Sequence, residues 1–488
     1  LILAQRVRNI STVLIIGLLA SFAINAGTGI MMQFASAQQL QRYISWGFGS
    51  FAAVSPENLA IMAPVVILSV VFALFLIKSL NALQTGEEHA RSLGINLQKS
   101  RLAIILLVSV SAATVTAFCG PISFFGIAIP HLARGLFRTS NHSKLIPGSA
   151  LLGANIAIAA DIIAQLPGLP TVLPLNAVSS LIGAPIVVIV LLRSLYGNKQ
   201  QRSTKNDSSF KTSFTERALA QKESLSLQAE LLDVGFPASN HQKAQNILLR
   251  SINLSLEPGQ LVALVGPNGS GKSSLLRTLA GLQNPLAGKI QLTRHTLDGH
   301  SGLGQAQQIS ALSPGQRARV ITAVFTPRSS SPQSPLFGDN MSVFAFTALG
   351  RTPYLPWHGK LKPADRQSIQ QGLELAGIDH LSDAPIGSLS DGELQRALIA
   401  RAIAQDTSII LLDEPTAHLD MNAGSEITRL LYNICQNSNR SILYSTHNLG
   451  LADKHAHIIA AVHAEGLHLF PRGRKRLETT SAFLGLAG

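Results

Sequence analysis

The stretch GPNGSGKSS, residues 266–274, has the residue types and spacing of a phosphate-binding loop. It follows the apolar run LVALV and precedes the helix-like segment SLLRTLAGL, which is the strand–loop–helix context that such a loop requires. Glycines let backbone N–H groups approach phosphates, and the helix N-terminus adds the positive end of its dipole. Lys272 would reach the β- and γ-phosphates of a nucleotide, and the Ser273 hydroxyl would bind Mg²⁺. The residues predicted to bind nucleotide are Gly266, Pro267, Asn268, Gly269, Ser270, Gly271, Lys272, Ser273 and Ser274.

Two adjacent acids end a second apolar segment. Residues 408–414 read SIILLDE, and the run of aliphatic side chains predicts a central parallel strand. Asp413 would hold Mg²⁺ directly or through water, and Glu414 would take a proton from an attacking water molecule. Acids at a strand end are often ordinary turn residues, but the phosphate-binding loop earlier in the same region favours the catalytic interpretation.

Two further segments carry candidate phosphate contacts. Residues 441–447, SILYSTH, predict a third buried strand that ends at His447. A single histidine is usually a satisfied polar residue, but this position could contact a γ-phosphate, so we favour that role. In residues 389–402, LSDGELQRALIARA, Ser390 and Gly392 stand at the start of a predicted helix, whose free N–H groups can receive a phosphate. These residues alone do not indicate which phosphate.

These segments lie in the second of two regions that differ in composition. The chain has 488 residues, so at least two domains are expected. Charged residues are only 13%, against ~25% in ordinary proteins, because the first 195 residues are apolar. The net charge of +13 could indicate nucleic acid, but many basic residues flank apolar segments, which favours an anionic membrane surface and no nucleic-acid partner. Cys119 and Cys435 lie in different regions, so no disulfide framework is implied.

The apolar region predicts six membrane-spanning helices, because about 20 apolar residues cross a bilayer. The expected spans are residues 11–32, 58–77, 102–119, 121–137, 145–166 and 174–192. Pro130, His131 and Arg134 interrupt the fourth of them. If the N-terminus is cytoplasmic, the outside segments hold only Arg42, and this asymmetry of basic residues supports that orientation. A cleavable signal peptide over residues 5–37 is the weaker alternative, since five further spans follow.

Two further features are a charged residue inside the apolar region and a polar segment at its C-terminal border. Asp161 lies inside the fifth span, where a charge costs ~2.5–3.5 kcal/mol on insertion scales, so it should face protein or water. A translocation-path residue is possible, but small neighbouring residues favour a helix–helix hydrogen bond or a position near the outer interface. Residues 196–226 are polar and rich in Ser, Lys and Gln. They predict a flexible or partly helical tether that keeps the soluble domain at the membrane.

Taken in order, GPNGSGKSS, LSDGE, ILLDEP, AHLD and STH resemble the ATPase of ABC transporters, and the similarity covers residues 227 to about 465. The resemblance implies a head-to-tail dimer that binds ATP and Mg²⁺ between the Walker motifs of one protomer and the signature segment of the other. Ser390 and Gly392 would then contact the γ-phosphate across the dimer. Asp420 is the D-loop residue, and Phe236 would stack on adenine. The signature residues are Leu389, Ser390, Asp391, Gly392 and Glu393.

The apolar region resembles the permease of type II ABC importers, which carry iron chelates, haem and vitamin B12. The segments that carry this resemblance are ALQTGEEHARSLGI (82–95), GPISFFGIAIPHLAR (120–134), LIPGSALLGANIAIAADIIAQ (145–165) and SSLIGAPIVVIVLLR (179–193). Permeases of the family have ten spans. This chain, which begins with Leu1, matches the last six, so the first four are expected to be missing or supplied elsewhere.

Three departures from the family pattern stand out. The signature reads LSDGE where LSGGQ is usual, so Asp391 and Glu393 add negative charge close to where phosphates should bind. The strand VITAVFTPR (320–328) should end in the Q-loop glutamine, but Thr326, Pro327 and Arg328 stand there and the next glutamine is Gln333. Permease and ATPase share one chain, whereas importers of this class usually keep them separate.

The segment GEEHARSLGINLQKSR, residues 86–101, is a polar island between the second and third spans. Ala90, Leu93 and Leu97 recur at helical spacing and form one apolar stripe, and Gly94 suits a helix C-terminus. In the family this cytoplasmic loop forms short helices that rest in a groove of the ATPase. The predicted coupling residues are Glu87, Glu88, Arg91 and Gly94. A solvated loop is the weaker alternative.

The fold expected is multi-domain, with an all-α polytopic membrane domain followed by an α/β P-loop ABC ATPase domain. The expected boundaries are 1–195 for the permease, 196–226 for the linker and 227–488 for the ATPase. We expect an ATP-driven importer of an iron–siderophore-like chelate in the cytoplasmic (inner) membrane, with its ATPase in the cytoplasm. Expected partners are the lipid bilayer, a second copy or a homologous subunit, an external substrate-binding protein and the small-molecule chelate. The alternatives are a haem or corrinoid importer, an exporter, and a membrane-tethered ATPase that does not transport.

Overall fold

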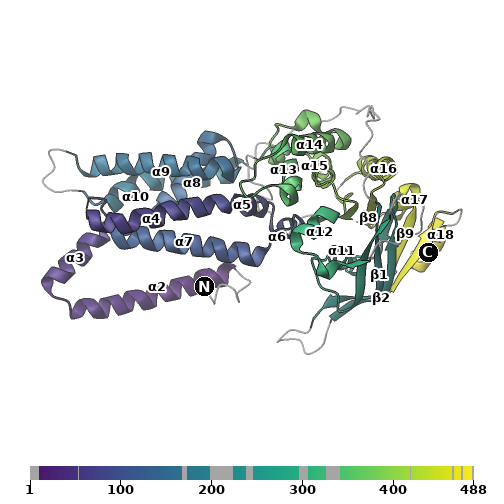
Figure 1. The fold of residues 1–488 in the computed structure, drawn as a ribbon, viewed down its shortest axis with the longest axis horizontal. Helices are drawn as coiled ribbons and strands as arrows, with labels where there is room; N and C mark the ends of the chain where they lie inside the picture. Colours follow the sequence, from purple (N-terminus) through teal and green to yellow (C-terminus); the bar gives the residue numbers. More distant parts are fainter. Residues whose placement is uncertain are drawn as a thin grey trace. The chain divides into compact units, whose positions relative to one another are not determined.

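The computed structural model describes residues 10–52, 54–166, 173–197, 224–237, 246–295, 306–325, 341–417, 419–463, 466–473 and 476–485 (Figure 1). The chain divides into two compact units, which are described separately. The first comprises Leu1–Leu76, Gln98–Thr139 and Ser143–Ser203, and the second comprises Ile77–Leu97, Ser140–His142 and Thr204–Gly488. The short segment Ile77–Leu97 therefore belongs with the ATPase region and not with the apolar helices that flank it in sequence.

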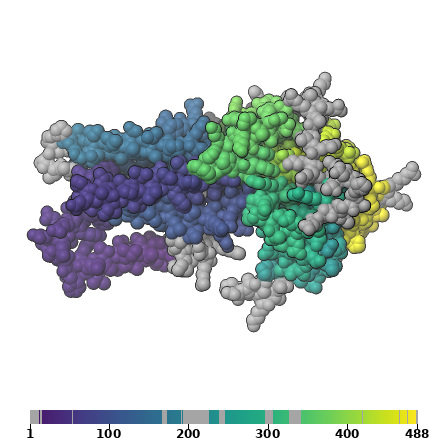
Figure 2. Space-filling view, viewed as in Figure 1, coloured from purple at the N-terminus to yellow at the C-terminus, as the bar shows by residue number. Residues whose placement is uncertain are grey.

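The first unit is helical in the described stretches, and most of its helices are apolar. They are α2 (Ile10–Gln33), α3 (Ala37–Gly47), α4 (Pro56–Phe75), α7 (Leu97–Cys119), α8 (Phe125–Phe137), α9 (His142–Ala164) and α10 (Leu175–Gly197). Large apolar side chains such as Leu18, Ile67 and Leu151 are more than half exposed, as expected for helices that face lipid. Figures 1 and 2 show α2 and α3, in purple, at one margin of this unit.

Four helices in the described part of the chain are long and apolar enough to cross a membrane. Their spans are Ile15–Gln33, Pro56–Phe75, Leu97–Cys119 and His142–Ala164, which correspond to the first, second, third and fifth predicted spans. The sixth predicted span lies on α10, which has 23 residues. On α9, Asp161 accepts a hydrogen bond from Gln165 of the same helix, with 2.7 Å between Nε2 and Oδ2. Its carboxylate is thus engaged within its own helix.

The fourth predicted span, residues 121–137, differs from the prediction. The helix there, α8, covers only Phe125–Phe137, which is 13 residues. At 1.5 Å per residue such a helix is ~20 Å long, shorter than the ~30 Å hydrocarbon core of a bilayer. Phe124 precedes the helix in a left-handed conformation with φ of 67°. The helix therefore begins at Phe125, and the first four residues of the predicted span, 121–124, are not part of it.

The second unit contains the sheet that the sequence predicts for the ATPase. The strands of this sheet lie in the order β10-β9-β3-β8-β7-β6. Their bounds are β3 (Leu261–Val265), β6 (Ile321–Phe325), β7 (Ile409–Asp413), β8 (Ser441–Thr446), β9 (Ile458–His463) and β10 (Gly466–Pro471). All neighbours are parallel except β9 and β10. Every residue of β3, β6 and β8 is buried, as expected for parallel strands covered on both faces, and in β3 this burial explains the continuous apolar run LVALV.

A second, antiparallel sheet has the order β2-β1-β4-β5. Its strands are β1 (Ser224–Phe236), β2 (Asn246–Leu256), β4 (Ala287–His295) and β5 (Gln307–Gln308). Strand β1 begins inside the range 196–226 that was predicted as a linker. Most of that range lies outside the described residues.

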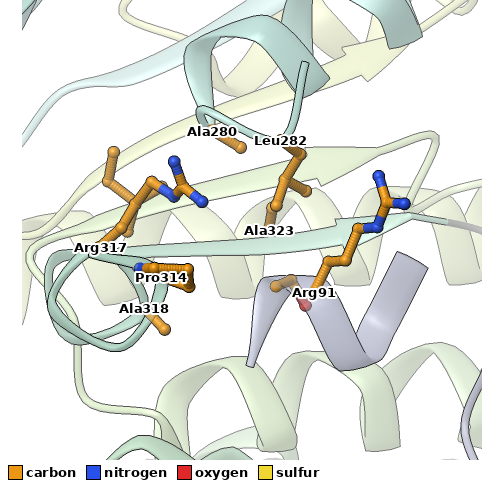
Figure 3. Close-up of a pocket in the computed structure, with 9 residues that line it drawn as sticks. Arg91, Ala280, Leu282, Pro314, Arg317, Ala318 and Ala323 are labelled. Carbon is orange, nitrogen blue, oxygen red and sulfur yellow. The ribbon is translucent and has the colours of Figure 1, made fainter. Parts of the chain in front are cut away.

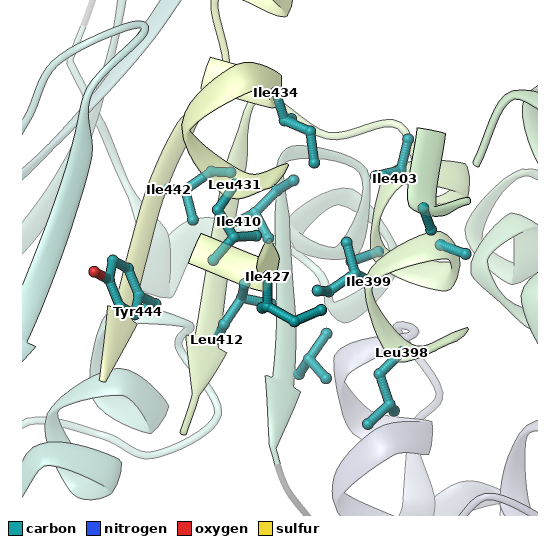
Figure 4. Close-up of a cluster of buried hydrophobic side chains, with 14 of the residues drawn as sticks. Leu398, Ile399, Ile403, Ile410, Leu412, Ile427, Leu431, Ile434, Ile442 and Tyr444 are labelled. Atoms are coloured by element: carbon teal, nitrogen blue, oxygen red, sulfur yellow. The ribbon is translucent and has the colours of Figure 1, made fainter. Parts of the chain in front are cut away.

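Helices cover the parallel sheet and carry the remaining elements of the site. They are α5 (Ile77–Leu83), α6 (Glu87–Ser92), α11 (Lys272–Leu279), α12 (Pro314–Val320), α13 (Val343–Ala348), α14 (Pro363–Ala376), α15 (Asp391–Ala404), α16 (Met421–Ser438), α17 (Leu449–His455) and α18 (Arg476–Phe483). Figure 4 shows how side chains of β7 and β8 meet those of α15 and α16 in one apolar core. Ala90 and Leu93 of the α6 segment belong to this same core.

Candidate nucleotide-binding site and its link to α6

The predicted phosphate-binding loop connects β3 to α11, as the sequence pattern requires. Gly271 precedes the helix with φ of 94°, which favours glycine, and a Cβ atom there would also crowd the side chains of Leu248 and Leu249 at 3.2–3.4 Å. The Lys272 ammonium donates to the carbonyl oxygens of Gly266 and Pro267, both at 2.8 Å. Burial lowers the pKa of Lys272, while the carboxylates of Glu414 and Asp413 oppose that shift. The ammonium group is therefore held where phosphate oxygens would compete for it.

The two predicted acids lie beside this loop. The Asp413 Oδ1 atom accepts hydrogen bonds from the hydroxyl of Ser273 at 3.0 Å and from that of Ser445 at 2.7 Å. Glu414 follows with φ of 48°, and its N–H donates to Ser445 Oγ at 2.8 Å. Ser273 and Asp413 are 140 residues apart in sequence, and the fold brings their side chains into hydrogen-bond contact. Ser273 and Asp413 both offer oxygen atoms as metal ligands. Mg²⁺ prefers oxygen ligands, so this pair fits the ion that accompanies ATP.

The signature segment forms the start of α15. Ser390 is the N-cap residue, and its hydroxyl donates to Glu393 Oε2 at 2.7 Å while the Ser390 N–H donates to the same oxygen at 2.8 Å. The carboxylate of Glu393 therefore folds back on its own helix. Asp391 is exposed, and Leu389 and Gly392 are half-buried. This geometry locates both acids that the LSDGE sequence adds and engages one of them in a capping box.

Three other predicted residues lie at element ends. His447 is exposed directly after β8, and Asp420 caps α16 by accepting a hydrogen bond from the Ala423 N–H at 2.7 Å. Phe236 is 50% exposed at the end of β1. Among the described residues, no hydrogen bond or ring contact joins His447 or Phe236 to the phosphate-binding loop, so their roles stay predictions. Residues 326–340, where the Q-loop departure was noted, lie outside the described residues.

The helix α6 is bonded to the ATPase region at several points. Glu88 forms an ion pair with Arg277 of α11, with 3.1 Å between the closest atoms. Gln405, fully buried after α15, donates to the carbonyl of Ser92 at 3.4 Å and to that of Ala318 at 2.8 Å. Ala90 and Leu93 are buried, as the periodicity predicts. The predicted rim residues Glu87, Glu88 and Arg91 are exposed.

Little space remains between α6 and its neighbours. A cavity of about 10 Å³, roughly the space of one water molecule, lies between α6, α12 and the turn after α11 (Figure 3). Its lining includes Arg91, Pro314, Arg317, Ala318 and Ala323. Burial lowers the pKa of Arg317. The close fit indicates that a displacement of α6 would be felt directly by α11 and α12.

A buried cation lies on the α15 side of α6. Arg401 is fully buried, and its three guanidinium nitrogens have no hydrogen-bond partner among the described residues. Its guanidinium lies 5.6 Å from the centre of the Phe346 ring, and burial lowers its pKa to about 10. Burial and Arg401 together lower the pKa of His89 to about 3, so the α6 imidazole is neutral at ordinary pH. A second charge at this contact is thereby avoided.

Sequence reasoning missed three residues of this arrangement. Ser445 stands inside the STH segment, Arg277 inside SLLRTLAGL, and Gln405 just past the signature helix. A polar residue within a buried strand or on the inner side of a short helix was the available signal. Its partner could not be read from the sequence.

Comparisons with known proteins agree with this geometry. Residues 1–193 match the FecCD transport family, and residues 249–417 match the ABC transporter family. A petrobactin import ATP-binding protein of Bacillus anthracis is 34% identical over 218 residues, which are 45% of this chain and 73% of that protein. The chain belongs to the ABC transporter family.

Two further relatives are also ATP-binding proteins of transport systems. An iron(3+)-hydroxamate import ATP-binding protein of Bacillus subtilis is 30% identical over 49% of this chain and 78% of its own length. An achromobactin transport ATP-binding protein of Dickeya dadantii is 31% identical over 45% of this chain and 75% of its own length. The ABC transporter described here thus fuses a FecCD permease domain to an ATPase that binds ATP and couples its hydrolysis to transport.

Proposed function

We propose that this ABC transporter imports an iron–siderophore-like chelate across the cytoplasmic (inner) membrane. The observation that carries the proposal is the bond between α6 and α11, because α11 begins at Lys272 of the phosphate-binding loop and α6 lies in sequence between two membrane spans. Such a bond supports a transmission of movement between ATP site and permease. Relatives named for petrobactin, hydroxamate and achromobactin support the siderophore class. A relative from Halobacterium salinarum named for cobalamin import keeps a corrinoid as the second candidate, beside haem.

The site residues divide the hydrolytic work as follows. Lys272 leaves the carbonyl oxygens of its own loop and binds the β- and γ-phosphates, and the N–H groups of residues 269–274 surround them. Ser273 and Asp413 would hold Mg²⁺, and the ion would supply positive charge that neutralises the phosphates. Glu414 accepts a proton from the attacking water molecule, and His447 contacts the γ-phosphate.

Two copies of the chain, or one copy and a homologous subunit, would complete the ATP sites. Ser390 and Gly392 of one protomer would contact the γ-phosphate bound by the other, and Asp420 would line the same interface. Phe236 would stack on adenine. An external substrate-binding protein would deliver the chelate, and closing and opening of the ATPase dimer would alternate access to the membrane pathway.

Uptake by the full gene product tests the proposal. Proteoliposomes that contain it and a candidate binding protein would be offered radiolabelled ferric siderophores, haem and cobalamin in parallel. We expect ATP-dependent accumulation of a ferric siderophore that stops when ATP is replaced by ADP. Accumulation of haem or cobalamin alone would replace the siderophore assignment. ATP hydrolysis without uptake of any of the three would support a membrane-tethered ATPase that does not transport.

Glu393 provides a test of the signature segment. Replacing Glu393 with Gln keeps a side-chain oxygen for the capping box but removes a negative charge close to the proposed γ-phosphate position. We expect the KM for ATP to fall about threefold to tenfold, which corresponds to ~1 kcal/mol of relieved repulsion at a partly exposed site. The measurement is steady-state hydrolysis against ATP concentration. Asp391→Asn is the matched control, and an effect in that variant alone would assign the repulsion to Asp391 instead.

The ion pair between Glu88 and Arg277 provides a test of the link to α6. Glu88 is 56% exposed, so the pair contributes only ~0.2–1 kcal/mol. Reversing the charge of Glu88 should therefore weaken the contact more than removing its carboxylate would. We expect Glu88→Arg to reduce uptake several-fold while leaving hydrolysis by the ATPase in place. The double variant Glu88→Arg, Arg277→Glu should recover uptake. Equal uptake in the wild type and in Glu88→Arg would exclude a role for this pair.

A further inference from the structure

Ser445 connects the two acids of the ATP site. It is the second-last residue of β8, whose parallel register with β7 pairs Leu412 with Tyr444 and so brings Ser445 beside Asp413. The side chain is fully buried. Its hydroxyl donates to Asp413 Oδ1 at 2.7 Å and accepts from the Glu414 N–H at 2.8 Å. The Ser445 hydroxyl therefore donates its single proton to the Asp413 carboxylate and accepts a hydrogen bond from the backbone of Glu414.

The bond to Asp413 fixes the direction of that carboxylate. Asp413 Oδ1 also accepts from Ser273, so two hydroxyl groups from α11 and β8 hold one oxygen between them. Groups that hold a metal-binding carboxylate in this way commonly affect metal affinity or activity by about 10–100-fold. The orientation of Asp413 is thus expected to depend on a residue that does not itself touch the nucleotide.

The bond to Glu414 stabilises an unfavourable backbone. Glu414 has φ of 48°, and the left-handed region costs a residue with a side chain ~1–2 kcal/mol. Such conformations persist at functional sites where neighbouring groups hold them. Because the Glu414 N–H ends on Ser445 Oγ, the serine determines where the backbone of the proposed general base turns, and hence where its carboxylate lies.

We infer that Ser445 is a positioning residue for ATP hydrolysis that sets both the metal-binding carboxylate of Asp413 and the backbone turn at Glu414. The inference rests on the roles proposed for these two acids. A purely structural serine would satisfy only its own hydrogen bonds. Ser441, fully buried on the same strand, is such a case, since its hydroxyl donates to the Glu257 carbonyl at 3.0 Å, outside the ATP site.

Ser441 makes a matched control possible. The full-length protein would carry Ser445→Ala, Ser445→Thr or Ser441→Ala, and the measurements would be kcat, the Mg²⁺ and Mn²⁺ concentrations for half-maximal activity, and ATP binding in EDTA. We expect Ser445→Ala to lower kcat about tenfold to a hundredfold and to raise the metal requirement, with ATP binding in EDTA unchanged. Ser445→Thr retains the hydroxyl and should recover most of the activity, and Ser441→Ala should resemble the wild type.

Two outcomes would overturn the inference. One is a Ser445→Ala enzyme whose kcat and metal requirement match those of Ser441→Ala. If Ser445→Ala does not fold, Ser445→Cys replaces it, because a thiol is nearly isosteric with the hydroxyl but is a weak donor and acceptor. Full activity of Ser445→Cys is the second outcome that would overturn the inference. A failure of the proposed function is distinguishable, since Glu414→Gln would then hydrolyse ATP normally, whereas a failure of this inference leaves Glu414→Gln inactive.

Discussion

Replacing Glu414 with Gln is expected to reduce steady-state ATP hydrolysis about 10²–10⁴-fold, the range that a positioned general base contributes. The amide cannot accept the proton that the attacking water molecule must lose. It has nearly the same size, so Lys272, Ser273 and Asp413 should still bind the nucleotide. We therefore expect ATP affinity to stay near the wild-type value while kcat falls. The measurement is phosphate release at saturating ATP and Mg²⁺, with nucleotide binding measured separately.

Glu426→Gln is the matched control for that variant. It makes the same chemical change on α16, where Glu426 pairs with Arg396 at 2.7 Å and is 53% exposed. Loss of this exposed pair should cost ~0–1 kcal/mol of stability and leave hydrolysis unchanged. Wild-type hydrolysis by Glu414→Gln would exclude Glu414 as the base. A loss of ATP binding in the same variant would instead indicate that its carboxylate holds the site together.

Local patterns predicted the elements that build the site. The runs before Gly266 and up to Asp413 are strands β3 and β7, and the stripe of Ala90 and Leu93 is buried. Each of these features depends on neighbours within a few residues, where side-chain periodicity and loop composition decide the structure. Gly94 follows α6 with φ of 82°, as its position at a predicted helix end requires.

Contacts between distant segments could not be predicted in this way. Glu88 and Arg277 are 189 residues apart, and Gln405 and Ser92 are 313 apart, so no spacing in the sequence relates them. The capping box at Ser390 was also missed, although Glu393 stands at the right position for it. The acids of LSDGE were considered only as charges near phosphate. The hydrogen bonds of Glu393 to Ser390 became apparent only in the three-dimensional structure.

The short helix α8 shows a third kind of limit. Its segment is apolar, but the helix is too short to be counted among the membrane spans, and hydropathy alone does not reveal where a helix begins. Phe124 adopts φ of 67°, an uncommon conformation for an aromatic residue, and Gly183 has room for no side chain because the Phe124 Cβ atom would lie 2.4 Å from it. A packing contact from α10 thus accompanies the position where α8 starts, and this contact is invisible in the sequence of α8 itself.

Gly94 gives the second large effect, because its surroundings leave no space for a side chain. A Cβ atom there would lie 2.9 Å from the Pro314 carbonyl oxygen, 3.0 Å from the Gly315 Cα and 3.1 Å from the Ala318 Cβ. Two of these atoms are backbone of α12 and cannot rotate away. Gly94→Ala should therefore displace the α6 segment from α12 at a cost of ~1–3 kcal/mol.

The expected result of Gly94→Ala is a loss of ATP-driven uptake of about tenfold or more, since 1.4 kcal/mol corresponds to a tenfold change in an equilibrium. The ATP site residues are untouched, so hydrolysis should continue. Uptake per ATP hydrolysed, measured in proteoliposomes, is the deciding quantity. A fall in both activities together would point to general destabilisation of the ATPase instead of a broken link.

Gly86 separates the two costs that Gly94→Ala combines. It has φ of 93° and ψ of 161°, a backbone region that is essentially confined to glycine, so an alanine there meets a backbone penalty of ~1–3 kcal/mol, but no atom lies within 4 Å of its Cβ position. Gly86→Ala should thus weaken the start of α6 without pushing it away from α12. If the contact with α12 transmits the movement, uptake per ATP falls much further in Gly94→Ala than in Gly86→Ala. Equal losses would mean that backbone strain alone accounts for the effect, and the contact with α12 would then have no part in coupling.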